Sequence, residues 1–191
     1  MALQDYSQQQ WRIYLQALGE LLQQDKREYS IMLIGGAVMC FAKGVRASTK
    51  DIDYVYMDAE CIYDSEDPYL ADKISEVAKQ FNLDEMWMEN SGGHFVVESM
   101  LEDVEFFEKL GGLNVYLPSL PTILAMKLLS ARIEDDKHDL EDVRWIIKEL
   151  GIRAEYEALI QVAKEVYNEE YPLLFGNTVQ QGRIERFIAL L

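Results

Sequence analysis

A buried-strand pattern that ends in two consecutive glycines constrains the fold of this chain more than any other feature. Residues 30–34 form an apolar run that Gly35 and Gly36 follow directly. This order predicts a buried strand that enters a tight turn. Residues 37–43 favour a short helix, and residues 51–57, rich in aromatic and branched side chains, predict a second strand. The segment is therefore expected to fold as strand, glycine turn, helix and strand.

The rest of the chain continues this alternation and then becomes helical. Apolar residues at helical spacing predict helices over residues 5–24, 69–81, 122–133, 138–150 and 154–168, with a short one from residue 178. Short branched or aromatic runs predict strands within residues 95–97, 104–107 and 113–117. We interpret residues 1–120 as an α/β (α+β) core with a mixed sheet, and residues 121–191 as a helical C-terminal lobe packed on it.

Charge and composition exclude several classes of protein. The 191 residues include 34 acids and 18 bases, a net charge of −16, and residues 51–110 hold 17 of the acids but only 3 of the bases. A binder of long nucleic acid needs a basic stripe, whereas this acidic middle would repel polynucleotides and anionic membranes. No apolar run reaches the roughly 18 residues of a membrane span. Cys40 and Cys61 lie beside apolar residues, which is typical of buried thiols in a reducing cytoplasm, where we expect the protein to reside.

The glycine turn and the second strand suggest phosphate and metal chemistry. A strand that enters Gly35 and Gly36 at a helix N-terminus lets the backbone approach an anion. Asp51 and Asp53 are two residues apart on the expected strand, which places both carboxylates on one face and Ile52 on the packed face. Paired carboxylates repel each other unless a cation lies between them, and Mg²⁺ prefers oxygen ligands and phosphate. We therefore expect the glycines to hold a polyphosphate and the aspartates to hold its metal.

These residues resemble a known family when the loop between them is included. The order reads Gly35-Gly36, a short helix, and then Arg46-x-x-Thr49-x-Asp51-Ile-Asp53. It is similar to the active-site signature of the DNA polymerase beta-like nucleotidyltransferase superfamily, and closer to its small bacterial branch, which includes AbiE-type toxins.

A second segment resembles the same branch. Residues 121–132 are similar to its Leu-x-x-x-Lys-x-x-x-x-Arg helix, with Lys127 and Arg132 at the charged positions. Residues 138–143 are similar to its Asp-x-x-Asp helix, with Asp139 and Asp142 at the acidic positions. The two segments and their order cover most of residues 31–150.

The resemblance implies a nucleotidyltransferase with a mixed-sheet core. It would move a nucleoside monophosphate from an NTP to an acceptor hydroxyl, with Mg²⁺. Asp51 and Asp53 would ligate one or two Mg²⁺, and Gly35 and Gly36 would bind the β- and γ-phosphates. Such in-line transfer depends on positioning and charge neutralisation more than on a special nucleophile.

The resemblance also implies a cleft between the core and the helical lobe. Lys127 would face this cleft and contact phosphate, while Arg46 and Thr49 would shape the loop that enters the catalytic strand. The acidic charge favours a small molecule or a protein side chain as the acceptor over long nucleic acid. A small RNA stays open as an acceptor because Lys43, Arg46, Lys50 and Lys127 could form a local basic patch.

Members of the superfamily with full activity usually carry a third carboxylate on a later strand. Glu98, Asp103 and Glu105 are the candidates, and Glu105 lies in the most strand-like run. None has the expected flanking pattern, which keeps a rival function open. The chain would then be a nucleotide-binding or regulatory partner, such as one half of a toxin–antitoxin pair, whose acidic surface meets a basic protein.

Other polar clusters and the tryptophans have simpler interpretations. Four acids near residue 139 could bind a metal, but we expect a charged first helical turn and a solvated face; they are Asp135, Asp136, Asp139 and Asp142. The three tryptophans are expected to pack in the core or lobe; they are Trp11, Trp87 and Trp145.

Overall fold

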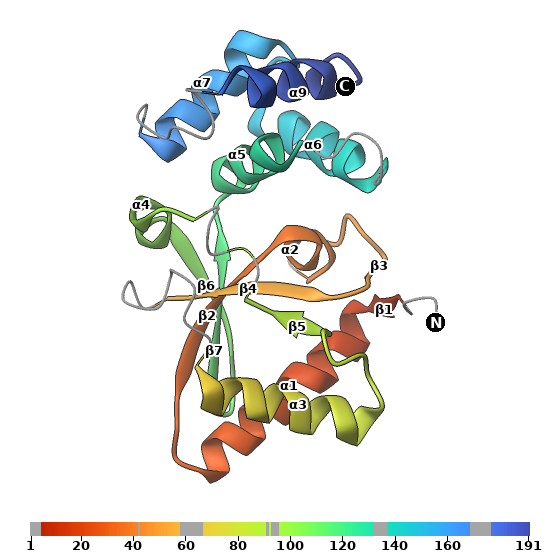
Figure 1. Cartoon of the computed structure of the whole chain (residues 1–191), viewed down its shortest axis with the longest axis vertical. Helices are drawn as coiled ribbons and strands as arrows, with labels where there is room; N and C mark the ends of the chain where they lie inside the picture. Colours follow the sequence, from red (N-terminus) through yellow and green to blue (C-terminus); the bar gives the residue numbers. More distant parts are fainter. Residues whose placement is uncertain are drawn as a thin grey trace. The chain divides into compact units, whose positions relative to one another are not determined.

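The chain forms a mixed α/β structure in the computed structural model, which describes residues 5–41, 43–57, 67–90, 92, 96–131, 137–168 and 177–191. Over these residues it contains eight helices and seven strands, drawn in Figure 1. The chain divides into two compact units, Met1–Pro118 and Ser119–Leu191. The first unit contains all seven strands, and the described part of the second is helical.

A five-stranded mixed sheet forms the centre of the first unit. Its order is β5 (Met88–Glu89), β4 (Ile52–Tyr56), β2 (Tyr29–Ile34), β7 (Leu113–Pro118) and β6 (Val104–Leu110). The pairs β2–β7 and β4–β5 are parallel, whereas β2–β4 and β6–β7 are antiparallel. The sheet is therefore mixed, as the sequence predicted. A separate two-stranded pair joins β1 (Tyr6–Ser7) to β3 (Ser48–Thr49).

Two amphipathic helices of the first unit lie side by side, α1 (Gln8–Gln24) and α3 (Pro68–Phe81) (Figure 1). Helix α1 begins at a capping box, in which Ser7 and Gln10 each accept a hydrogen bond from the other's backbone. The box satisfies N–H groups that would otherwise lack partners. The sequence interpretation extended this helix back to residue 5, which is wrong because Tyr6 and Ser7 pair with β3 instead.

The tryptophans of the first unit pack where these helices meet the sheet. Trp11 and Trp87 are 0% and 1% exposed, and their rings stack with centroids 5.9 Å apart. The indole N–H of Trp87 donates to the Ile74 carbonyl at 3.0 Å. Both tryptophans are thus core residues, as predicted, and they fix the chain directly before β5.

The short elements were the hardest to predict. The sequence pattern predicts neither β3, which lies in the loop that leads to β4, nor β5. It indicates a strand at residues 95–97, but Val96 and Val97 are not in a strand, and residue 95 lies outside the described residues. Helix α4 (Glu98–Glu102) follows directly. In contrast, β2, β4, β6 and β7 lie where strands were expected.

The second unit surrounds one apolar helix. Helix α5 (Leu120–Ser130) begins at Ser119, whose side chain accepts from the Thr122 N–H, and it contacts the three other described helices of the unit. These are α6 (Lys137–Leu150), α7 (Tyr156–Tyr167) and α9 (Thr178–Ile188). Because α5 is apolar on nearly all sides, it needs neighbours around it. Among the described helices, none is long and apolar enough to cross a membrane.

Candidate functional site

The turn after β2 brings a glycine against a carboxylate. Strand β2 ends at Ile34, and α2 (Gly35–Phe41) begins at once. The predicted strand and helix are confirmed, but the helix starts two residues earlier than expected, so the two glycines form its first residues instead of a separate turn; we call them the glycine turn. Gly35 has a φ of +62°, a left-handed conformation that glycine adopts without strain. A Cβ placed on Gly35 would lie 2.7 Å from Oδ2 of Asp53. Glycine therefore suits this position because it adopts the φ without strain and leaves space for the carboxylate of Asp53.

The second glycine of the turn faces two residues of the predicted loop. A Cβ on Gly36 would lie 2.9 Å from Nη1 of Arg46 and 2.9 Å from Oγ1 of Thr49. The backbone at Gly36 is thus approached by a guanidinium, which can donate hydrogen bonds to phosphate oxygens, and by the Thr49 hydroxyl. Gly36 therefore meets residues that lie 10 and 13 positions further along the sequence.

The loop between α2 and β4 folds back on its own helix. The backbone N–H groups of Val45 and Arg46 both donate to the Met39 carbonyl, at 3.0 and 3.3 Å. Thr49 is 7% exposed, and its Oγ1 donates to the Asp51 carbonyl at 3.4 Å. These contacts connect the end of α2 to the beginning of β4.

The two aspartates lie at the beginning of β4. Asp51 directly precedes the strand and is exposed, Ile52 is buried, and Asp53 is half-buried on the strand. Asp53 is the register partner of Ile34 on β2, so it is held beside the glycine turn by sheet pairing. The strand itself is shorter than residues 51–57, because Asp51 and Met57 lie outside it.

A third carboxylate, which the sequence interpretation missed, lies on the neighbouring strand. Glu89 of β5 is the register partner of Asp53, and Met88 is the partner of Ile52. Ile52 and Met88 are 0% and 4% exposed on one face, so Asp53 and Glu89 share the other face. Strand β5 has only two residues, which is too short for a period-2 pattern to reveal it.

Two of the three carboxylates expected for this role, Glu98 and Asp103, are not on a strand. Glu98 lies in α4, and Asp103 is the C-cap of that helix. Glu105 is on a strand, but β6 is separated from β4 by β7 and β2, a distance of about 14 Å at the usual strand spacing. Glu105 therefore cannot share a metal with Asp53.

The donor set suits a hard cation that also binds phosphate. Among the described residues, no group of three or more His, Cys, Asp or Glu side chains is arranged to hold a metal. Asp51 and Asp53, with Glu89 on the same face as Asp53, supply only carboxylate oxygens. Mg²⁺ is bound in this way in many proteins, by one or two carboxylates, substrate phosphate and water.

Lys127, the remaining predicted site residue, lies in the helical unit and binds two carboxylates there. Its Nζ lies 2.5 Å from Oδ1 of Asp139 and 2.6 Å from Oδ2 of Asp142, and its side chain is 7% exposed. Its proposed contact with phosphate stays a prediction, and the other predicted site residues all lie in the first unit.

The expectation of a solvated acidic face on α6 is wrong. Asp142 is 0% exposed and Asp139 is 6% exposed, because both turn towards the buried ammonium of Lys127. Asp135 and Asp136 lie outside the described residues. The spacing contained the signal, since Asp139, Asp142, Val143 and Ile146 follow the i, i+3, i+4, i+7 pattern of one helix face, and the last two are 0% exposed.

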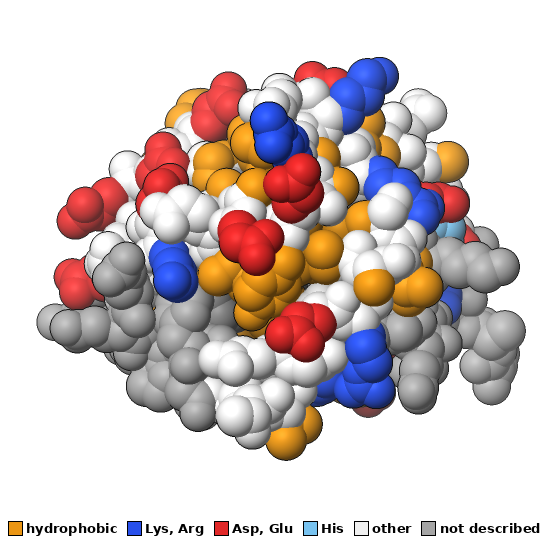
Figure 2. Space-filling view, turned by 90° about the horizontal axis from the view of Figure 1, so that it is seen from above, with side chains coloured by type: hydrophobic (Ala, Val, Ile, Leu, Met, Phe, Trp, Pro, Cys, Tyr) orange, Lys and Arg blue, Asp and Glu red, His pale blue; other side chains and the backbone are white. Residues whose placement is uncertain are grey.

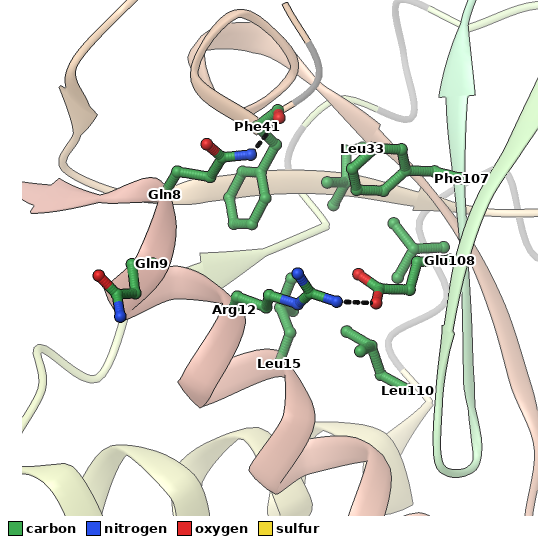
Figure 3. Close-up of a pocket in the computed structure, with 10 residues that line it drawn as sticks. Gln8, Gln9, Arg12, Leu15, Leu33, Phe41, Phe107, Glu108 and Leu110 are labelled. Atoms are coloured by element: carbon green, nitrogen blue, oxygen red, sulfur yellow. Dashed lines mark hydrogen bonds and ion pairs between the residues drawn. The ribbon is translucent and has the colours of Figure 1, made fainter. Parts of the chain in front are cut away.

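A separate pocket lies on the other face of the sheet. It has a volume of about 230 Å³ and is lined mainly by apolar side chains, with Arg12 and Glu108 forming an ion pair at its wall (Figure 3). Its sheet residues include Leu33, the neighbour of Ile34, and alternation puts the two on opposite faces. The pocket therefore does not contain the predicted phosphate or metal residues.

The negative charge is not gathered on the face shown in Figure 2. Acidic and basic side chains alternate there around apolar ones, over the residues that the view describes. The described part of this face therefore does not present charge of a single sign to a partner.

In comparisons with known proteins, no protein-family model, curated protein or solved structure matches the chain.

Proposed function

We propose that the protein is a Mg²⁺-dependent nucleotidyltransferase that binds an NTP at the turn between β2 and α2. One observation carries the proposal. The carboxylate of Asp53 abuts Gly35, while Arg46 and Thr49 approach Gly36. A carboxylate oxygen that can bind a metal and a guanidinium that can bind phosphate thus lie against the two glycines, and Gly35 has a left-handed φ that glycine adopts without strain.

The proposed reaction makes one bond and breaks one. The acceptor hydroxyl oxygen bonds to the α-phosphorus of the NTP. The bond from that phosphorus to the oxygen that bridges the α- and β-phosphates breaks, and pyrophosphate leaves with that oxygen. Arg46 would orient the phosphates by hydrogen bonding, and Thr49 would hold the loop in place through its hydrogen bond to the Asp51 carbonyl. Asp51 and Asp53 would hold Mg²⁺. When bound, the metal supplies charge neutralisation for the triphosphate.

Glu89 is our candidate for the third carboxylate that the resemblance implies. It lies on a later strand, in register with Asp53 and on the same face. Its role would be to accept the proton of the attacking hydroxyl, which is general-base catalysis. Glu89→Gln is expected to lower turnover about 100-fold or more while leaving Mg·NTP binding largely intact.

The charge near the turn limits the acceptor. Lys43, Arg46 and Lys50 lie on the loop beside the glycines, and Asp51 and Asp53 follow directly. This short loop can neutralise the phosphates of a nucleotide, but it is not a stripe that tracks a long polyanion. We therefore propose a small molecule, a protein side chain or a small RNA as the acceptor.

The test is Mg²⁺-dependent NTP binding and transfer in Asp51→Asn/Asp53→Asn. The matched control is Glu98→Gln/Asp103→Asn, which removes the same charge at α4. Each protein is titrated with the four common NTPs and Mg²⁺ by calorimetry, and is then incubated with labelled NTP and cell extract. We expect binding and labelling to be lost in the first variant and kept in the control. Unchanged Mg-dependent binding and labelling in the first variant would mean that the metal assignment is wrong.

A rival function is favoured by edge strand β6. Phe106 and Phe107 are 53% and 37% exposed, and Glu102, Asp103 and Glu105 beside them are exposed too. Such an edge suits a basic, extended partner segment, as expected of a regulatory protein without efficient transfer. This function predicts that the wild-type protein binds Mg·NTP but labels no acceptor in the extract.

A further inference from the structure

The N-terminal residues hold both ends of the loop that carries Arg46 and Thr49. We name Tyr6, Ser7 and Gln8 the N-terminal strap. At one end of the loop, the side-chain amide of Gln8 donates to the Phe41 carbonyl at 2.6 Å, a bond shown in Figure 3. At the other end, Tyr6 and Ser7 pair with β3.

The first of these contacts satisfies a group that the helix leaves unpaired. Phe41 is the last residue of α2, and the final carbonyl groups of a helix have no partner within it. The Gln8 amide supplies that partner from 33 residues away. The bond therefore fixes the point where the chain leaves α2 and enters the loop.

The second contact fixes the far end of the loop and is itself anchored. Tyr6 is the register partner of Thr49. Its ring is 9% exposed and lies edge-on to Trp11, with centroids 4.8 Å apart. The strand pairing thus connects Thr49 to the tryptophan core of the first unit.

We propose that Gln8 is a positioning residue, which holds the loop so that Arg46 and Thr49 face Gly36 before the nucleotide arrives. This inference rests on the proposed function. An ordered loop loses less conformational entropy on binding, so the strap raises affinity for the nucleotide without touching it.

The chain offers a closely matched control in Gln9. It is the same residue type, is exposed like Gln8, and points away from Phe41 in Figure 3. Two variants of Gln8 separate positioning from stability. Gln8→Ala removes the donor. Gln8→Glu also removes it, but it places an acid in a first turn that has none, where acids stabilise a helix.

The experiment compares wild type, Gln8→Ala, Gln8→Glu and Gln9→Ala by three measurements. These are affinity for the tightest-binding Mg·NTP, amide hydrogen exchange of residues 43–49, and urea unfolding. Both Gln8 variants should weaken Mg·NTP binding about three- to tenfold and speed exchange in the loop, while Gln9→Ala should change neither. Gln8→Glu should unfold at the same or a higher urea concentration than wild type.

The outcomes separate this inference from the function on which it rests. If amide exchange of residues 43–49 is unchanged in the Gln8 variants, the N-terminal strap does not hold the loop, whatever the protein binds. Faster exchange with unchanged affinity overturns the positioning role. If the wild-type protein binds no Mg·NTP and loop exchange is still faster in the Gln8 variants, the proposed function is wrong. The claim that Gln8 orders the loop is then still supported.

Discussion

Removing the buried lysine of the helical unit should destabilise the protein strongly. Lys127→Met removes an ammonium group that lies 2.5 Å from the carboxylate of Asp139 and 2.6 Å from that of Asp142. The side chains of these aspartates are 9% and 1% exposed, respectively. Breaking a buried pair on one side leaves an uncompensated charge, which costs about 3–5 kcal/mol. The methionine keeps most of the side-chain volume, so little of this loss comes from a cavity.

The assay is urea unfolding at pH 7, followed by circular dichroism. The matched control is Lys148→Met on the same helix as the two aspartates, since Lys148 is exposed and its removal should change stability by less than about 0.5 kcal/mol. Adding Asp142→Asn to Lys127→Met should recover part of the loss, because it removes a buried charge. A loss below about 1 kcal/mol, or one equal to the control, would refute the reasoning.

Two further predictions concern the packing and titration of the fold. Gly19→Ala should destabilise the protein by several kcal/mol, because the new Cβ would lie 1.7 Å from the Leu110 carbonyl oxygen. Gly182→Ala in α9 should instead stabilise it by about 0.5–1 kcal/mol, because nothing lies within 4 Å of its Cβ position. Urea unfolding measures both changes, and similar free energies of unfolding for the two variants would contradict the packing at Gly19. Burial and the hydrogen bond that it donates to Asp67 raise the pKa of Tyr29 to about 12. The folded state therefore favours the protonated phenol, so this stabilisation is complete below the unfolded pKa of about 10 and is lost as the pH rises towards 12. In Tyr29→Phe, absorbance titration of tyrosinate should lose the latest-titrating group, and an unchanged titration above pH 11 would show that Tyr29 is not that group.

Local signals made the glycine turn predictable. An apolar run, two glycines and a branched strand follow one another within residues 30–57, and each step depends on neighbouring residues only. The structure has β2, α2 and β4 in that order. The same order placed Gly35 near Asp53, which the geometry bears out.

Long-range pairing explains what could not be predicted. Strand β5 is two residues long and forms only because it pairs with β4, about 36 positions earlier in the sequence. The residues next to Glu89 therefore give no pattern from which the strand could be predicted. Strand β3 exists through the N-terminal residues that pair with it. Residues far apart in sequence must first be brought together before such short strands form.

The acids of α6 show a different limit. A run with several carboxylates was interpreted as solvated, yet Asp139 and Asp142 share the face of the buried Val143. Their burial depends on Lys127, which lies 12 and 15 positions earlier on another helix. Helical periodicity indicates which face is buried, but it does not show which partner neutralises an acid on that face.

The most direct test of the central claim uses Mn²⁺ in place of Mg²⁺, with ATP, in an NMR experiment on the labelled protein. Paramagnetic broadening should be strongest at the amides of Gly35, Gly36 and Asp53, and it should disappear in Asp53→Asn. Broadening confined to other acidic segments, such as residues 98–105, would contradict the proposal that the aspartates at the glycine turn hold the metal.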